Sequence, residues 1–162
     1  MVRENSEEVL SYRTKYSYNK SFDVALLTSF EPEDGVDKYS FYENIADTVR
    51  KLGKSVFVPH IDISLKWGDR KIYNVINNII LPTSDIAISH IGIEYSSAVD
   101  TMNVNAQFNK IPLICIKEKS SKAKINLLTF GPKILGTVNF IEFESERDCI
   151  DKLVENLKRF YK

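Results

Sequence analysis

The chain has 162 residues, of which 43% are hydrophobic, and its 22 basic and 22 acidic side chains cancel. This length suits one domain with a sizeable core, and the balanced charge provides no overall field that would favour nucleic acid or a membrane surface. Apolar runs are too short to span a membrane and no signal-peptide segment is present, so we expect a cytoplasmic protein. The two cysteines, Cys115 and Cys149, lack metal-ligand spacing and are expected to be buried free thiols.

Predicted strands and helices alternate along the chain, and the strands over Ile86–Ser89 and Ile111–Ile116 are continuous apolar runs. Such runs are typical of parallel strands that are covered on both faces. The pattern predicts an α/β fold with a doubly wound, mainly parallel five-stranded sheet in the flavodoxin-like order 2-1-3-4-5. A polar extension over residues 1–20 precedes this single domain, which is expected over residues 21–162.

The elements expected in chain order are a short helix over Ser6–Arg13, a strand over Phe22–Thr28, a helix over Tyr39–Leu52 ended by Gly53, a strand over Ser55–Pro59, a helix over about Arg70–Leu81 ended by Pro82, a strand over Ile86–Ser89, a helix over about Ala98–Phe108, a strand over Ile111–Ile116, irregular structure over Ile125–Gly136, a strand over Val138–Phe143 and a helix over Glu146–Tyr161.

The loop after the third strand is the first place to expect a functional site. Residues 84–116 form a strand, a polar loop, a helix and a second strand, which together make a βαβ unit. Ligands of open α/β sheets bind outside the carboxyl ends of the strands, so chemistry is expected between His90 and Asp100. The hydroxyls of Ser29, Ser96 and Ser97, with the backbone amides that begin the helix, are candidates for binding a phosphate.

Other side chains are expected at the same edge of the sheet. His60 and Asp62 follow the second strand, and His60 is the better placed histidine for ligand contact, with a capping role at the strand end as the alternative. Either Asn77 or the asparagine after it is placed to point toward the same strand ends. Phe30 and Tyr42 are candidates to stack on a nucleobase, because flat aromatic rings cluster near the first strand end.

Several short segments form a recognisable pattern. They are Thr28-Ser29-Phe30 at the end of the first strand, Pro59-His60 at the end of the second, Ser84-Asp85-Ile86-Ala87-Ile88 in the third, Ser96 with Val99 and Ala106 on the following helix, and Asn109-Lys110-Ile111-Pro112-Leu113-Ile114 leading into the fourth. In this pattern the chain resembles the nucleoside 2-deoxyribosyltransferase-like superfamily, which includes deoxyribosyltransferases and 2'-deoxynucleoside 5'-monophosphate N-glycosidases. The resemblance runs from about residue 22 to residue 116.

The resemblance implies cleavage or transfer at the N-glycosidic bond of a nucleoside or nucleotide. In that superfamily a glutamate on the helix after the third strand attacks the anomeric carbon and forms a covalent glycosyl-enzyme. Here Met102 occupies that position, while Asn77 corresponds to an aspartate and Asp100 to a glycine of the family. Ser96 matches a serine that contacts the ligand in the glycosidases. The resemblance also implies a homodimer whose subunits complete each other's sites, and it implies neither a metal nor an organic cofactor.

Asp100 is the candidate replacement for the missing glutamate, because a thioether cannot supply a nucleophilic carboxylate. Catalysis through Asp100 requires that its side chain face the ligand from the first turn of the helix or from the loop before it. The alternative is that Asp100 only stabilises the N-terminus of this helix. Glu94 is a second loop carboxylate, either paired with Asp100 for acid/base work or simply solvated. In the first turn, Asp100 would repel a phosphate and so favour a nucleoside over a monophosphate.

Three functions are compatible with these residues. The first is an N-glycosidase or deoxyribosyltransferase-like enzyme that uses Asp100 or another carboxylate. The second is a non-catalytic binder or sensor of a nucleoside or nucleotide, and the third is an interaction module without a ligand. They predict, respectively, an acidic side chain in the pocket, an aromatic pocket without one, and a pocket filled by Met102 and its neighbours. The fold alone does not choose among them.

Overall fold

The computed structural model of the protein describes residues 6–29, 38–92, 96–121 and 138–162. Its elements in chain order are α1 (Glu7–Tyr16), β1 (Val24–Leu27), α2 (Tyr39–Lys51), β2 (Val56–Phe57), α3 (Pro59–Asp62), α4 (Asp69–Val75), the π-helical segment η1 (Ile76–Ile80), α5 (Leu81–Thr83), β3 (Ile86–Ile91), α6 (Ser97–Phe108), β4 (Leu113–Glu118), β5 (Val138–Phe143) and α8 (Glu146–Phe160). The irregular structure expected over residues 125–136 lies outside the described residues.

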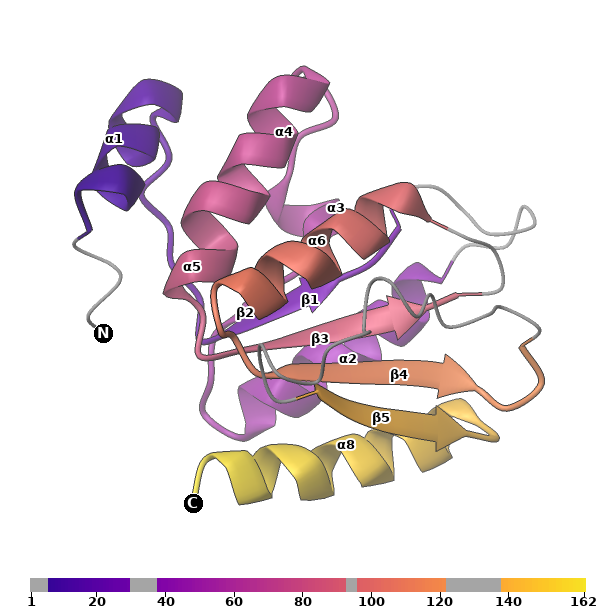
Figure 1. Cartoon of the computed structure of the whole chain (residues 1–162). Helices are drawn as coiled ribbons and strands as arrows, with labels where there is room; N and C mark the ends of the chain where they lie inside the picture. Colours follow the sequence, from indigo (N-terminus) through magenta and orange to yellow (C-terminus); the bar gives the residue numbers. More distant parts are fainter. Residues whose placement is uncertain (1–5, 30–37, 93–95, 122–137) are drawn as a thin grey trace.

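Five parallel strands form one sheet in the order β2-β1-β3-β4-β5. Helices α2 and α8 cover one face of the sheet, and α4, α5 and α6 cover the other (Figure 1). The predicted doubly wound sheet and its strand order are therefore confirmed. Four strands differ in their bounds from the prediction. β1 is Val24–Leu27 and β4 is Leu113–Glu118, β2 has only two residues because α3 begins at Pro59, and β3 continues through His90 to Ile91.

The sheet separates two layers of apolar side chains. One layer packs beneath α4–α6 and includes Leu27 and Ile79, and the other packs beneath α2 and α8 and includes Ile45 and Leu153. All four of these side chains are fully buried, and burial of one such side chain contributes about 1.5–3 kcal/mol. The two layers fix the helices on the sheet and so fix the positions of the loops at its carboxyl edge.

The helix before β3 changes its pitch in the middle. Ile76–Ile80 is π-helical, and Pro82 lies inside α5 instead of ending the helix at Leu81. Proline has no N–H to donate and its ring crowds the preceding turn, so a regular α-helix is disfavoured at this point. The hydroxyls of Thr83 and Ser84 each donate a hydrogen bond of 2.7 Å to a backbone carbonyl four residues earlier. These bonds satisfy carbonyl groups at the end of the helix.

Helix α1 packs on the domain of its own chain. Ser6 caps the helix by accepting a hydrogen bond from the backbone of Val9 at 3.2 Å, and Val9 is buried. Near its other end, the Arg13 guanidinium donates to the carbonyl of Lys20 at 3.0 Å and to the hydroxyl of Ser21 at 2.6 Å. The described part of the extension is therefore a helix that lies beside α4 (Figure 1).

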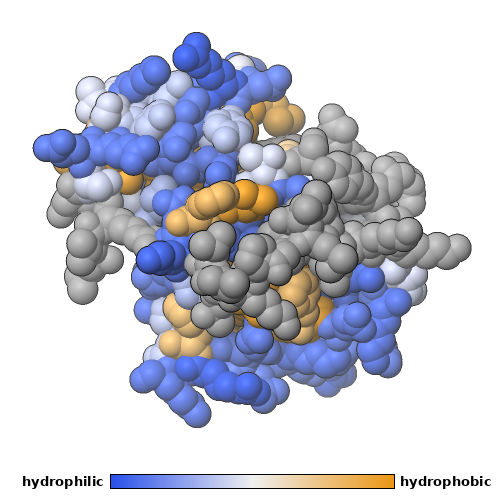
Figure 2. All heavy atoms as spheres, in the orientation of Figure 1, coloured by the Kyte–Doolittle hydropathy of each residue, from blue (hydrophilic) through white to orange (hydrophobic). Residues whose placement is uncertain are grey.

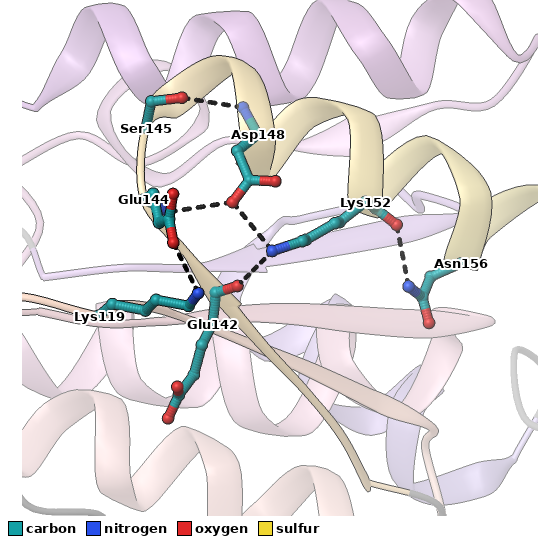
Figure 3. A network of polar contacts seen from close by, with 7 residues as sticks. All are labelled: Lys119, Glu142, Glu144, Ser145, Asp148, Lys152 and Asn156. Carbon is teal, nitrogen blue, oxygen red and sulfur yellow. Dashed lines mark hydrogen bonds and ion pairs between the residues drawn. The ribbon is translucent and has the colours of Figure 1, made fainter.

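A polar network joins the carboxyl ends of β4 and β5 to α8 (Figure 3). Lys119 pairs with Glu144 at 2.7 Å, and Lys152 pairs with Asp148 at 2.9 Å. The Lys152 ammonium also donates to the carbonyl of Glu142 at 2.8 Å, and Asp148 accepts from the backbone of Glu144 at 3.0 Å. Water and salt screen exposed ion pairs of this kind, so they contribute little to stability, and we assign the network a local role in the connection from β5 to α8.

On the face shown in Figure 2, hydrophilic residues dominate the described surface and the apolar patches are separate from one another. Among the described helices, none combines the length and the apolar composition that crossing a bilayer requires.

Candidate functional site

β1 and β3 are neighbours in the sheet, but the chain leaves them toward opposite faces. After β1 it continues to α2, and after β3 it continues to α6 on the other side (Figure 1). In open α/β sheets such a switch point marks the ligand site. We call this part of the structure the switch-point edge and define it by Thr28, Ser29, His90 and the first turn of α6.

The end of β1 contributes a buried and a half-buried side chain to the switch-point edge. Thr28 is 1% exposed, and Ser29 next to it is half-buried. The structure thus brings Ser29 to the expected edge of the sheet. Phe30, and likewise Glu94, lie outside the described residues.

His90 lies at the carboxyl end of β3 and is buried. The Tyr42 hydroxyl lies 2.8 Å from His90 Nδ1, and the rings of Phe41 and Tyr42 contact the imidazole edge-on, with centroids 5.7 and 5.6 Å away. Burial, with a smaller contribution from the charge of Lys38, lowers the pKa of His90 to about 4. His90 is therefore neutral at pH 7. Tyr42 is itself only 3% exposed, so its ring packs inside the protein and is not an open surface for a base.

His60 occupies the first turn after β2 and forms a cluster with α2. Its Nε2 lies 3.1 Å from Glu43 Oε1, and its ring stacks on Tyr39 with centroids 4.4 Å apart. Its Nδ1 is buried and has no hydrogen-bond partner within the described ranges. Asp62 accepts a hydrogen bond of 2.8 Å from the backbone of Val58, which closes the α3 turn. Asp62 thus holds the end of β2, whereas the described contacts of His60 are with α2.

The first turn of α6 carries three of the predicted residues. Ser96 is the N-cap: its hydroxyl accepts a hydrogen bond from the backbone of Val99 at 3.3 Å, and its carbonyl accepts one from Asp100 at 3.0 Å. Ser97 is the first residue of the helix. Asp100 is half-buried and lies in the first turn, where the helix dipole favours a carboxylate.

Met102 faces the interior. It is 3% exposed and belongs to the apolar layer between α6 and the sheet, together with Val99, Ala106 and Leu113. Met102, to which the sequence resemblance assigns the position of the nucleophile, is therefore part of the core. Because successive helical residues turn by about 100°, Asp100 lies about 200° around the axis from Met102 and points away from that core.

Asn77 lies at the opposite edge of the sheet from the switch point. It is 5% exposed, accepts a hydrogen bond from Asn105 at 2.8 Å and donates one to the carbonyl of Tyr73 at 3.0 Å. Asn105 lies in the last turn of α6, which ends near the amino end of β4. The amide of Asn77 therefore joins two helices and makes no described contact at the carboxyl ends of the strands. Asn78, the other asparagine considered, bonds to Asn74 in its own helix at 2.8 Å.

Two surface hollows lie near the amino ends of the strands. The one of about 380 Å³ is lined in part by Lys110, and the one of about 220 Å³ by Pro112. Within the described part of the chain, no group of three histidine, cysteine or carboxylate side chains is placed to hold a metal ion.

Two residues near the switch-point edge have contacts that the sequence does not predict. The sequence pattern places His90 at the start of the loop, since a polar residue after an apolar run usually ends a strand, but β3 continues through it. Glu43 gave no signal, because one acidic residue on an amphipathic helix normally faces solvent. Its contact with His60 depends on how α2 packs beside β2.

Comparison with known proteins adds a fold relationship. No family model matches the sequence, and no curated protein matches it. Among solved structures, the chain is similar to the CMP N-glycosidase BcmB of Clostridium botulinum, with a TM-score of 0.60 and 16% identity over 85% of this chain and 99% of that chain. At this identity the likeness establishes the fold alone: the chain shares its α/β architecture with a nucleotide N-glycosidase.

Proposed function

We propose that the protein binds a nucleoside or nucleotide at the switch-point edge and cleaves its N-glycosidic bond, with the Asp100 carboxylate as nucleophile. The proposal joins the residue pattern of the deoxyribosyltransferase-like superfamily to the fold shared with a CMP N-glycosidase. The observation that carries it is the position of Asp100, a half-buried carboxylate in the first turn of the helix that follows β3.

The reaction follows the retaining glycosidase scheme. A carboxylate oxygen of Asp100 bonds to the anomeric carbon while the carbon–nitrogen bond breaks, and its electron pair leaves with the base, which takes up a proton. Water then hydrolyses the glycosyl ester, which releases the sugar and restores the carboxylate. A hydroxyl acceptor in place of water would make the reaction a transfer.

The remaining predicted residues are assigned to ligand binding. Ser29 and Ser96, with Ser97 and the free amides of α6, would contact the sugar or its phosphate, and Phe30 would stack on the base. His60 would lie beside the ligand at the end of β2. These assignments rest on the residue pattern and on the position of each residue along the chain.

By the same resemblance we propose a homodimer. Size-exclusion chromatography with light scattering tests this directly, and a mass equal to one chain at micromolar concentration would contradict it.

The activity is tested by incubating the protein with a panel of ribo- and deoxyribonucleosides and their 5'-monophosphates. CMP is tried first, and chromatography measures the free base released. Asp100→Asn removes the nucleophile, and Asp47→Asn is the matched control, because Asp47 is an exposed carboxylate on α2 that pairs with Arg50 at 2.8 Å. We expect base release by the wild type and by D47N, and a loss of at least a hundredfold in D100N.

Two results would reject parts of the proposal. Base release by D100N at the wild-type rate would remove Asp100 from the mechanism. Saturable binding of a panel member without any base release would reject catalysis and leave a protein that only binds its ligand.

A further inference from the structure

His90 is the first residue of β3 beyond the pairing with β1. The last pair between these strands is Leu27 with Ser89, whereas His90 still pairs with Ile116 of β4 on its other side. The two strands therefore separate at this residue. Because the ligand site of an open α/β sheet lies where neighbouring strands lead in opposite directions, His90 occupies the base of the switch-point edge.

The imidazole is held in one orientation by its neighbours. Tyr42 contacts Nδ1 through its hydroxyl at 2.8 Å, and the rings of Phe41 and Tyr42 stand at 80° and 69° to the imidazole plane. The residue keeps 7% of its surface exposed, and its Nε2 has no hydrogen-bond partner among the described residues. Burying a polar ring in this way costs more than burying an apolar one of the same size, so packing alone does not account for a histidine here.

The charge and tautomer of His90 follow from this setting. Burial and the nearby Lys38 hold its pKa near 4, far below its ordinary value, so the ring is neutral at pH 7. A neutral imidazole has one acceptor and one donor nitrogen. The 2.8 Å contact between the Tyr42 hydroxyl and Nδ1 fits either direction of donation. If the hydroxyl donates, the proton lies on Nε2, and that N–H is directed away from Tyr42.

We propose that His90 contacts the ligand: its Nε2–H donates a hydrogen bond to an uncharged oxygen of the nucleoside, either a carbonyl of the base or a hydroxyl of the sugar, and Tyr42 is the positioning residue that fixes the tautomer. This inference rests on the proposed function, since it takes the nucleoside as ligand. It adds a residue that selects for a neutral acceptor, because an uncharged imidazole attracts a phosphate much less than an imidazolium does.

The test is nitrogen-15 NMR of the imidazole rings in the full-length protein. The sequence has only two histidines, so the ring signals that disappear in His60→Gln belong to His60 and those that remain belong to His90. In the wild type, His60 serves as an internal reference. In the free wild type we expect His90 as the Nε2–H tautomer, and in Tyr42→Phe a mixture of tautomers. Saturating CMP is expected to shift the Nε2 signal of His90. Free cytosine and ribose 5-phosphate are titrated separately, since a shift with only one of them identifies the base or the sugar as the contact.

Calorimetry with the same probes gives the affinity. We expect His90→Phe to weaken CMP binding about tenfold, the size of one hydrogen bond, and His90→Gln, which retains an N–H donor, to recover part of the loss.

The inference is overturned if free His90 is the Nδ1–H tautomer, or if CMP binds the wild type and H90F equally without shifting the His90 signal. If the wild type binds no member of the nucleoside panel, the proposed function fails and this inference fails with it. CMP binding that leaves His90 unaffected removes this inference alone.

Discussion

Asp100 and Met102 are two residues apart on α6 but lie in different environments. Met102 is 3% exposed and packs between the helix and the sheet, whereas Asp100 is half-buried in the first turn of the helix. Met102, to which the sequence resemblance assigns the position of a glutamate, is therefore a core residue. Any carboxylate chemistry at this edge of the sheet requires another residue.

Restoring the glutamate is therefore expected to harm the protein. Met102→Glu would bury a carboxylate without a partner in an apolar layer, and we expect it to lower the free energy of unfolding by about 3 kcal/mol or more. Met102→Leu is the control, with a cost below about 1.5 kcal/mol. Urea unfolding at pH 7 measures both. A stable M102E protein with faster base release than the wild type would show that Met102 faces the ligand after all.

The buried contact between Asn77 and Asn105 is expected to stabilise the packing of α6 on the helix before β3. Asn77→Ala leaves the Asn105 amide without its partner, and we expect a loss of about 1–3 kcal/mol in unfolding free energy. Asn78→Ala is the control, because Asn78 is less buried and bonds only within its own helix, to Asn74 at 2.8 Å. A double-mutant cycle with Asn105→Ala measures the coupling. A coupling of zero would contradict the contact.

The N-caps of α6 and α8 provide a matched pair of substitutions. Ser96 and Ser145 each accept a hydrogen bond from the backbone three residues later, at 3.3 and 3.2 Å. Ser96→Ala and Ser145→Ala are each expected to cost about 1 kcal/mol of stability. Only Ser96→Ala is expected also to weaken nucleoside binding, because α8 follows β5, two strands from β3, and covers the other face of the sheet. Equal effects of both variants on binding would indicate that Ser96 is only a cap.

Stability is expected to depend on pH through His90. Its pKa is about 4 in the folded protein, below the ordinary value of about 6.5 that applies to the unfolded chain. Between these values the unfolded state binds more protons than the folded state. The stability that the neutral, buried ring of His90 contributes is therefore fully present above pH 6.5 and is lost as the pH falls toward 4. From pH 7 to pH 4.5 we expect the wild type to lose about 2–3 kcal/mol more unfolding free energy than His90→Phe.

Urea unfolding of the two proteins at both pH values measures this difference. Carboxylates also titrate over this pH range, but they are common to both proteins, so their effect on stability cancels in the comparison. The same loss in both proteins would show that His90 is not buried in the neutral form.

The sequence predicted the parts of the fold that local patterns specify. The apolar run over Val138–Phe143 and the helical spacing that follows it were placed correctly, and Gly53 ends α2 in the left-handed conformation with φ of 74°. Patterns of this kind depend on neighbours in the chain, which a sequence displays directly.

What the sequence missed depends on packing between distant segments. His90 belongs to β3 because it pairs with Ile116 of β4, and Tyr42 and Phe41 of α2 contact its ring. The amide of Asn77 turns to Asn105 on another helix instead of to the strand ends. No local pattern distinguishes these side chains from ordinary loop or surface residues, because their partners come together only in the folded sheet.

The central claim, that Asp100 attacks the anomeric carbon, is tested most directly by trapping the glycosyl-enzyme. In a 2-deoxy-2-fluoro nucleoside, the fluorine destabilises the oxocarbenium-like transition states and so slows both formation and hydrolysis of the glycosyl-enzyme. A base that leaves readily restores the rate of formation, so that the glycosyl ester accumulates. Intact-mass spectrometry followed by peptide mapping then locates the sugar. We expect one sugar adduct on the peptide that contains Asp100 and none in Asp100→Asn. An adduct on another carboxylate, or base release that persists in D100N, would contradict it.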